Sequence, residues 1–235
     1  MTEVTAERRL EITSGLDAAR ARILRAEAAA NRPTGSVGLV VVTKTFPAAE
    51  VAVLAELGVR HVGENRDNEA APKAEALAGL GLVWHYVGQL QTNKARSVAR
   101  YSSIIESVDR IKLVNALSRA AEEAERALDC LVQVSLDDRP GRGGAEPAQV
   151  MGVAEAIEAS AGLTLRGVMA LAPLDGDPDL AFERLAVVAG QVQSEHPDAS
   201  TISAGMSGDL EEAVRHGATH VRLGSAILGY RPLVG

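Results

Sequence analysis

Eight short apolar runs, rich in β-branched residues, alternate with helix-like segments along the chain. This order favours parallel strand–helix–strand units, because parallel neighbours need a long crossover connection. Several expected helices are followed by glycine, at Gly58, Gly162 and Gly217, and glycine is the usual residue just past a helix end. The expected strands lie at 37–44, 61–65, 84–89, 102–108, 129–135, 163–171, 201–207 and 219–225.

Eight such repeats predict an α/β fold, a closed (β/α)8 TIM barrel, and 235 residues suit it. A doubly wound open sheet is the alternative, but it usually has fewer strands and, for dinucleotides, a glycine-rich first turn. The only glycine-dense loop, GRGG at 141–144, follows the fifth run and lacks the G-x-G-x-x-G spacing. No linker or shift in composition divides the chain, so residues 1–235 are expected to form a single domain.

An extra N-terminal helix is expected before the first strand. Apolar residues three or four apart fall on one face of it. Gly15 weakens this prediction, since glycine costs about 1 kcal/mol against alanine inside a helix, and NRPTG at 31–35 ends the element. The apolar face comprises Ile12, Leu16, Ala19, Ile23, Ala26 and Ala30.

Composition narrows the functional classes. A net charge of −7 and only 3% aromatic residues argue against a nucleic-acid partner. Cys130 is the only cysteine, which excludes a disulfide framework and predicts a small buried hydrophobe. The N-terminus lacks the apolar core of a signal peptide, and no run reaches the roughly 18 apolar residues of a membrane span. We therefore expect a cytoplasmic protein with no membrane partner.

Lys44 ends the first apolar run, in VVVTKTFP. It is either a strand-end charge that reaches water or a nucleophilic amine in a partly dry site. Chemistry in such barrels gathers at the C-terminal ends of the strands. Because other polar residues are expected at the same end, the functional interpretation is favoured. They are Glu64, Asn65, Gly88, Gln89, Glu106, Ser107, 133–135, Met169, 205–207 and 222–225.

The loops after the seventh and eighth strands suggest a phosphate site. Ser207 in GMSGDLEEA is placed as a helix N-cap, and Gly224 and Ser225 open a short helical turn. Each serine alone could be only a cap. These two loops are the usual phosphate site of such barrels, and helix N-termini favour anions, so their joint occurrence favours phosphate binding.

A lysine and a phosphate site on neighbouring first and eighth strands suit a phosphorylated aldehyde held as a Schiff base. Pyridoxal 5′-phosphate (PLP) is the obvious candidate. Arg222 would then face its ring, the alternative being a salt bridge to a carboxylate such as Glu64. A Schiff-base aldolase for a phosphorylated sugar, without PLP, is a further alternative.

Several segments together resemble the pyridoxal phosphate homeostasis protein family, single-domain PLP barrels similar to the alanine racemase N-terminal domain. They cover most of the chain in the right order. The segments are VVVTKTFPAAEV, HVGENRDNEAAPKA, WHYVGQLQTNKARSVA, IESVDRIKLVNALSRAA, LRGVMALAP and ISAGMSGDLEEAVRHGATHVRLGSAILGYR.

The resemblance implies PLP on Lys44, a phosphate group held by the two serines and the intervening glycine, and Arg222 at the pyridine nitrogen. It further implies storage, delivery or protection of PLP. PLP-dependent apo-enzymes are expected as recipients, and the chain is expected to be a monomer. One departure is the loop at 139–144, RPGRGG, where the family often has a lysine before the glycine. The implied cofactor-binding residues are Lys44, Asn65, Met206, Ser207, Arg222, Gly224 and Ser225.

The residues also bear on whether the protein is an enzyme. An arginine at the pyridine nitrogen disfavours ring protonation, which suits racemisation better than transamination. A two-base racemase needs a proton donor or acceptor on each face of the ring, and only Lys44 is an evident candidate. The tyrosines are expected in or beside the core. The histidines that open strands two and three are expected in the barrel wall or at the end of the barrel opposite the mouth, so a carrier is favoured over a racemase. They are Tyr86, Tyr101, Tyr230, His61 and His85.

The remaining lysines receive other interpretations. Lys94, after the third strand, either lies near the mouth and handles PLP transiently or is a solvated helix residue. Lys73 and Lys112 are expected at the surface.

Overall fold

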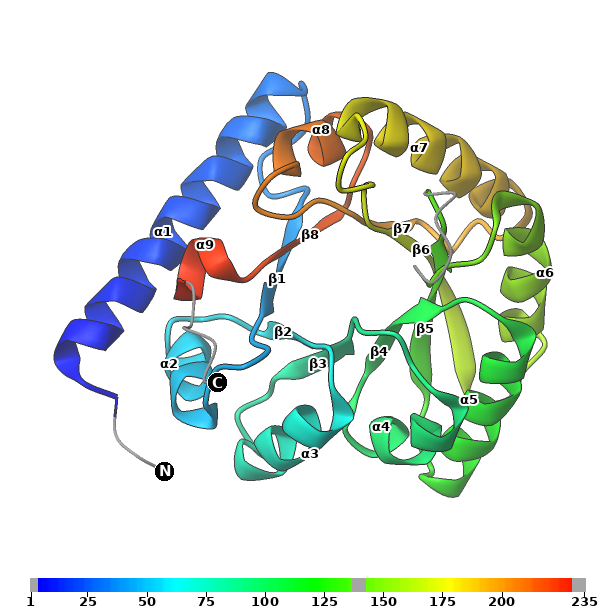
Figure 1. Ribbon diagram of the computed structural model, residues 1–235, viewed down its shortest axis with the longest axis horizontal. Helices are drawn as coiled ribbons and strands as arrows, with labels where there is room; N and C mark the ends of the chain where they lie inside the picture. The colour runs from blue at the N-terminus through cyan, green and yellow to red at the C-terminus, as the bar shows by residue number, and fades with distance from the viewer. Residues whose placement is uncertain (1–3, 137–142, 230–235) are drawn as a thin grey trace.

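The computed structural model describes residues 4–136 and 143–229 and contains a closed barrel of eight parallel strands. Each strand pairs with its neighbours in sequence, and β8 closes the barrel on β1, with Val40 opposite Arg222. The helices form a ring outside the strands (Figure 1). The strands are β1 (Gly38–Val42), β2 (His61–Glu64), β3 (Val83–Tyr86), β4 (Ile104–Val108), β5 (Leu128–Val134), β6 (Leu163–Ala170), β7 (Thr201–Ser203) and β8 (His220–Leu223).

The predicted TIM barrel and its eight strands are confirmed. Tyr230 and most of the 139–144 loop lie outside the described residues. The helices are α1 (Ala6–Ala29), α2 (Ala48–Glu56), α3 (Asp67–Ala76), the 3-10 turn η1 (Thr92–Lys94), α4 (Ala95–Tyr101), α5 (Ile111–Glu123), α6 (Pro147–Glu158), α7 (Pro178–Glu195), α8 (Leu210–Arg215) and α9 (Ser225–Leu228).

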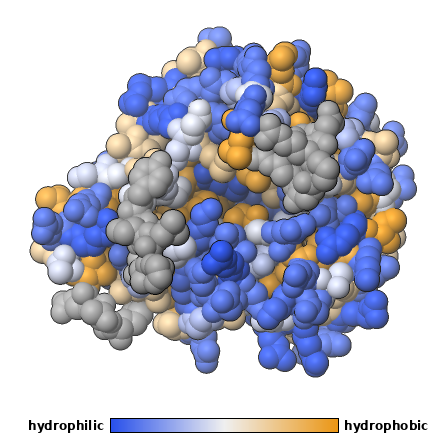
Figure 2. All heavy atoms as spheres, in the orientation of Figure 1, coloured by the Kyte–Doolittle hydropathy of each residue, from blue (hydrophilic) through white to orange (hydrophobic). Residues whose placement is uncertain are grey.

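Two apolar clusters pack between the barrel wall and the helices and form the hydrophobic core. Cys130 lies in one of them and is fully buried, as predicted. Hydrophilic residues are spread over much of the outer surface on the face drawn in Figure 2. Among the described residues, no helix combines the length and the apolar character needed to cross a membrane.

The extra N-terminal helix is confirmed, and its predicted face packs against α8 and α9. Gly15 has a packing reason, because a Cβ there would lie 2.5 Å from the Ile227 carbonyl oxygen. Glycine therefore allows α1 to approach the backbone of α9. Further along α1, Arg22 donates to the Ser207 carbonyl oxygen at 2.7 Å and forms an ion pair with Glu211. The helix thus holds the outer side of the loops that follow β7 and β8.

The barrel interior departs from the usual layers of branched aliphatic side chains. Instead, charged and polar groups meet there, and they are almost completely enclosed. Burying such groups is costly unless their hydrogen bonds are satisfied. The principal members are His85, Glu106, Ser203 and Arg222.

Candidate functional site at the barrel mouth

A cavity of about 360 Å³ opens at the C-terminal ends of the strands. Four of the seven predicted cofactor-binding residues line it, one from each of four places in the chain: Lys44, Asn65, Met206 and Arg222. Amide side chains and apolar groups complete the lining, including Gln89, Gln133 and Leu171. The cavity therefore offers an amine, a guanidinium and neutral hydrogen-bonding groups, with apolar walls.

Lys44 stands on a tightly held turn just beyond β1. Thr43 donates its amide to the Gly63 carbonyl oxygen at 2.9 Å, and the next residue but one, Thr45, has a positive φ of 68°. A β-branched residue pays a steric cost there, so the surrounding contacts must impose the conformation. One such contact is the hydrogen bond from the Thr45 amide to Glu69. Lys44 itself is exposed, which corrects the expectation of a partly dry site.

The cavity wall beside Asn65 depends on Gly88. A Cβ at Gly88 would lie 2.2 Å from the Asn65 carbonyl oxygen. Any larger residue would push the ends of β2 and β3 apart, so glycine sets the shape of this side of the mouth.

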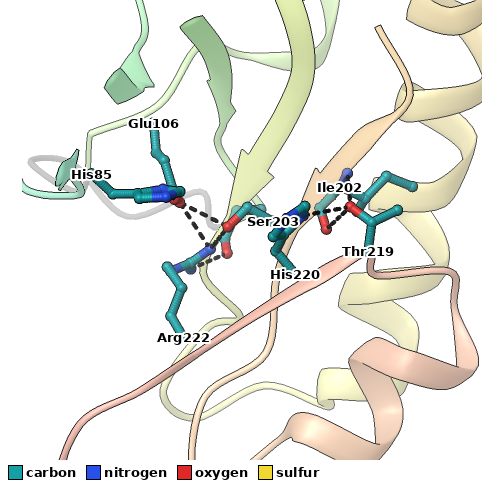
Figure 3. A network of polar contacts seen from close by, with 8 residues as sticks. His85, Glu106, Ile202, Ser203, Thr219, His220 and Arg222 are labelled. Carbon is teal, nitrogen blue, oxygen red and sulfur yellow. Dashed lines mark hydrogen bonds and ion pairs between the residues drawn. The ribbon is translucent and has the colours of Figure 1, made fainter. Parts of the chain in front are cut away.

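Arg222 lines the cavity although only 4% of it is exposed. Its Nη1 donates to Ser203 Oγ at 2.7 Å and lies 3.5 Å from Glu106 Oε2, while Nη2 donates to the Ala170 carbonyl at 2.8 Å (Figure 3). The proposed alternative, an ion pair with Glu64, is wrong as to the partner. The carboxylate that pairs with Arg222 belongs to Glu106. Sequence reasoning placed Glu106 at the mouth, but it lies inside the barrel.

Both oxygens of Glu106 are occupied. His85 Nδ1 lies 2.6 Å from Oε1, and Ser203 Oγ donates to Oε2 at 2.7 Å. Burial opposes ionisation, but the hydrogen bond from His85 and the charge of Arg222 outweigh it and lower the Glu106 pKa to about 2. Since an ionised carboxylate only accepts hydrogen bonds, His85 must carry its proton on Nδ1.

The same histidine extends the network toward the N-terminal end of the barrel. His85 Nε2 lies 2.9 Å from His61 Nδ1. Burial and the neighbouring histidines lower the pKa of His61 to about 4, which keeps this ring neutral near pH 7. A second cavity of about 180 Å³ lies beneath Glu106 and is also lined by Ser203 and His220. The network therefore separates two cavities.

Glu64 and Lys73 form a second buried pair, outside the barrel. Lys73 Nζ on α3 donates to Glu64 Oε1 at 2.7 Å and to the Thr43 carbonyl oxygen at 2.9 Å. The expectations that Lys73 lies at the surface and that Glu64 faces the mouth are both wrong. Burial raises the Glu64 pKa, although Lys73 and Thr43 partly offset this effect.

The predicted phosphate residues occupy the expected loops, with one correction. Ser207 is not an N-cap, because Asp209 occupies that position and α8 begins at Leu210. Gly224 precedes α9 and Ser225 is its first residue, as predicted. Among the described residues, nothing accepts a hydrogen bond from the amides of Ser207 or Gly208. These loops offer donors to an anion, but Ser207, Gly224 and Ser225 do not line the 360 Å³ cavity.

The residues weighed as a second base lie elsewhere. Tyr86 is buried in the outer apolar cluster, and burial raises its pKa. Of the described residues that line the mouth cavity, none is a tyrosine, histidine, aspartate or glutamate. Lys94 is half-exposed, lies 3.7 Å from Asp67 and does not line the cavity. Sequence reasoning missed the Glu106–Ser203–Arg222 connection, because its members come from separate strands and share no local motif.

The closed parallel barrel belongs to the class of fold found in the alanine racemase N-terminal domain, and in this chain Lys44 and the buried Arg222 line its mouth cavity. The sequence profile of that domain family matches residues 15–232. The chain belongs to the pyridoxal phosphate homeostasis protein family. A relative from Mycobacterium bovis named pyridoxal phosphate homeostasis protein is 44% identical, covering 97% of this chain and 95% of its own length.

Two solved structures place the fold in context. PipY of Synechococcus elongatus, solved with PLP bound, is 33% identical with a TM-score of 0.77, covering 88% of this chain and 100% of PipY. An alanine racemase of Clostridium difficile has a TM-score of 0.69 at 15% identity, which shows a shared fold alone. That match covers 90% of this chain but only 56% of the racemase, so the racemase chain extends beyond the shared barrel.

Proposed function

We propose that this chain binds PLP on Lys44 and serves intracellular PLP homeostasis as a carrier rather than as an enzyme. The observation that carries the proposal is that Lys44 and Arg222 line one cavity at the barrel mouth. PLP supplies an aldehyde that condenses with an amine, with loss of water, to form a Schiff base. The family membership and the PLP-bound PipY relative support the choice of this ligand.

The chain's other groups suit the rest of such a ligand. Arg222 can donate to a ring nitrogen, since Nη1 and Nη2 each use a hydrogen bond on the barrel and, in the described part of the chain, Nε has no acceptor. The unpaired amides of the β7–α8 loop and the first amides of α9 can bind a phosphate group. In this proposal Ser207, Gly224 and Ser225 hold the phosphate, and Asn65 and Met206 flank the ring.

The proposal extends to the protein's setting. Residues 1–235 act as one PLP-binding unit in the cytoplasm, as a monomer, and PLP-dependent apo-enzymes receive the cofactor. The family membership supports a role in PLP homeostasis. The net charge of −7 argues against a nucleic-acid partner.

Addition of PLP to the purified protein is expected to produce a visible absorption band that borohydride converts to a stable adduct. Reduction fixes the new carbon–nitrogen bond, so peptide mass mapping should find the pyridoxyl group on Lys44. Lys94 serves as the internal control, because it is half-exposed yet outside the cavity. No visible band, or an adduct spread over surface lysines, would contradict the proposal.

Amino-acid racemisation is the second candidate function, because the alanine racemase domain profile covers residues 15–232. We expect no exchange of the α-hydrogen of D- or L-alanine in deuterated water with the PLP-loaded protein. Apart from Lys44, no described residue lining the cavity is an evident proton acceptor. Proton NMR with an alanine racemase as positive control checks this result. Exchange above the level given by free PLP would favour the racemase.

A further inference from the structure

Glu106 and Arg222 form a charge pair inside the barrel, where both are at least 96% buried. Isolated charges in such a place are strongly unfavourable, so the pair persists only with its hydrogen bonds satisfied. All the partners are present: His85 at one carboxylate oxygen, and Ser203 and Arg222 at the other. Aliphatic residues would fill this space at less cost, so the arrangement calls for a functional reason.

The geometry makes Glu106 control the position of Arg222 in two ways. The carboxylate attracts the guanidinium directly across 3.5 Å. It also accepts a hydrogen bond from the Ser203 hydroxyl, which turns a lone pair of Ser203 Oγ toward Arg222 Nη1 at 2.7 Å. An arginine side chain has many rotamers to choose from, and these contacts hold it in one orientation at the cavity wall.

We propose that Glu106 is a positioning residue for the cofactor ring: through Ser203 and the ion pair, it holds the Arg222 guanidinium where it donates to the pyridine nitrogen of PLP. This inference rests on the proposed function. Glu106 has no place in the mouth cavity, so it acts only through Arg222. His85 supports it by holding the carboxylate from the other side.

The Glu106→Gln variant replaces one carboxylate oxygen, which accepts hydrogen bonds, with an NH₂ group, which donates them. The volume of the side chain hardly changes. The Nδ1 proton of His85 requires an acceptor, so the amide oxygen faces His85 and the amide NH₂ group faces Ser203 and Arg222. The amide NH₂ group can no longer accept from the Ser203 hydroxyl, and it places a donor opposite Arg222 Nη1 in place of the carboxylate. Arg222 therefore loses its ion pair, and the orientation of the Ser203 hydroxyl is no longer fixed. Glu64→Gln is the matched control, because Glu64 is equally buried and ion-paired but lies outside the barrel.

The test compares PLP with its 1-deaza analogue, in which a C–H group replaces the ring nitrogen. Kd for each is measured by visible absorption titration of the full chain. In Glu106→Gln, we expect the Kd of PLP to rise about fivefold, which is about 1 kcal/mol, and the Kd of the analogue to change less than about twofold. In Glu64→Gln, the ratio of the two Kd values should equal that of the wild type.

An equal loss for both ligands in Glu106→Gln would overturn the inference, because a merely structural role weakens both. If the wild type binds neither ligand, the proposed function fails instead. Ser203→Ala provides the test if Glu106→Gln does not fold, since it keeps both charges and removes the bridging hydroxyl. We expect a smaller shift of the Kd ratio in the same direction, and an unchanged ratio would again overturn the inference.

Discussion

Replacing Lys44 with alanine is expected to abolish the borohydride-stable pyridoxyl adduct and to weaken PLP binding by about a hundredfold or more. The covalent link is lost, and a loss of roughly 3 kcal/mol corresponds to a factor of about a hundred. Lys44 is exposed on a turn, and replacing an exposed side chain with alanine usually changes stability little, so the fold should be unaffected. Visible absorption, equilibrium dialysis and far-UV circular dichroism measure the three effects.

Lys94→Ala is the matched control, since it removes an amine that follows β3 but does not line the cavity. Its adduct yield and PLP affinity should equal those of the wild type. Retention of a stoichiometric adduct in Lys44→Ala would show that another amine reacts. Residual binding without an adduct would instead measure what Arg222 and the phosphate-binding loops contribute on their own.

Replacing Lys73 with alanine is expected to lower the free energy of unfolding by about 3–5 kcal/mol at pH 7, because it leaves Glu64 buried without its counter-charge. Urea unfolding followed by circular dichroism measures the change. The loss should shrink as the pH falls, because the pKa of Glu64 is already raised and protonation removes the uncompensated charge. For a carboxyl group with a raised folded-state pKa, acid favours the folded state.

Two further variants separate the buried pair from a general effect of removing lysine. Lys112→Ala on α5 removes an exposed amine and should change the free energy of unfolding by less than about 0.5 kcal/mol. The double replacement Glu64→Gln with Lys73→Met should recover much of the loss, since no lone charge remains. A destabilisation by Lys73→Ala below about 1 kcal/mol would mean that solvent reaches Glu64.

The Lys73–Glu64 pair also bears on the candidate site. Glu64 accepts from Thr43 Oγ1 at 2.7 Å, and Lys73 donates to the carbonyl oxygen of the same residue. Thr43 directly precedes Lys44, so the pair braces the turn that presents the amine. In Lys73→Ala, we therefore expect unfolding to begin at this turn, next to the cavity.

The sequence alone was sufficient to predict the architecture and much of the candidate site. The spacing of apolar residues specified the α1 face and eight strands, because burial periodicity is a local property of the chain. The rule that parallel barrels work at their C-terminal ends correctly brought Lys44, Asn65, Met206 and Arg222 to one cavity. Even Gly15, a weakness in the helix prediction, belongs to that helix.

Only the tertiary structure decided which charges pair. Lys73 was expected at the surface because it lies in helix-like sequence, yet α3 places its amine against Glu64. Glu106 follows the alternation of β4, but whether it faced the mouth or the interior depended on strand stagger and on partners from β3, β7 and β8. Pairing energies depend on distance and burial in space, and a linear sequence contains neither until the barrel closes.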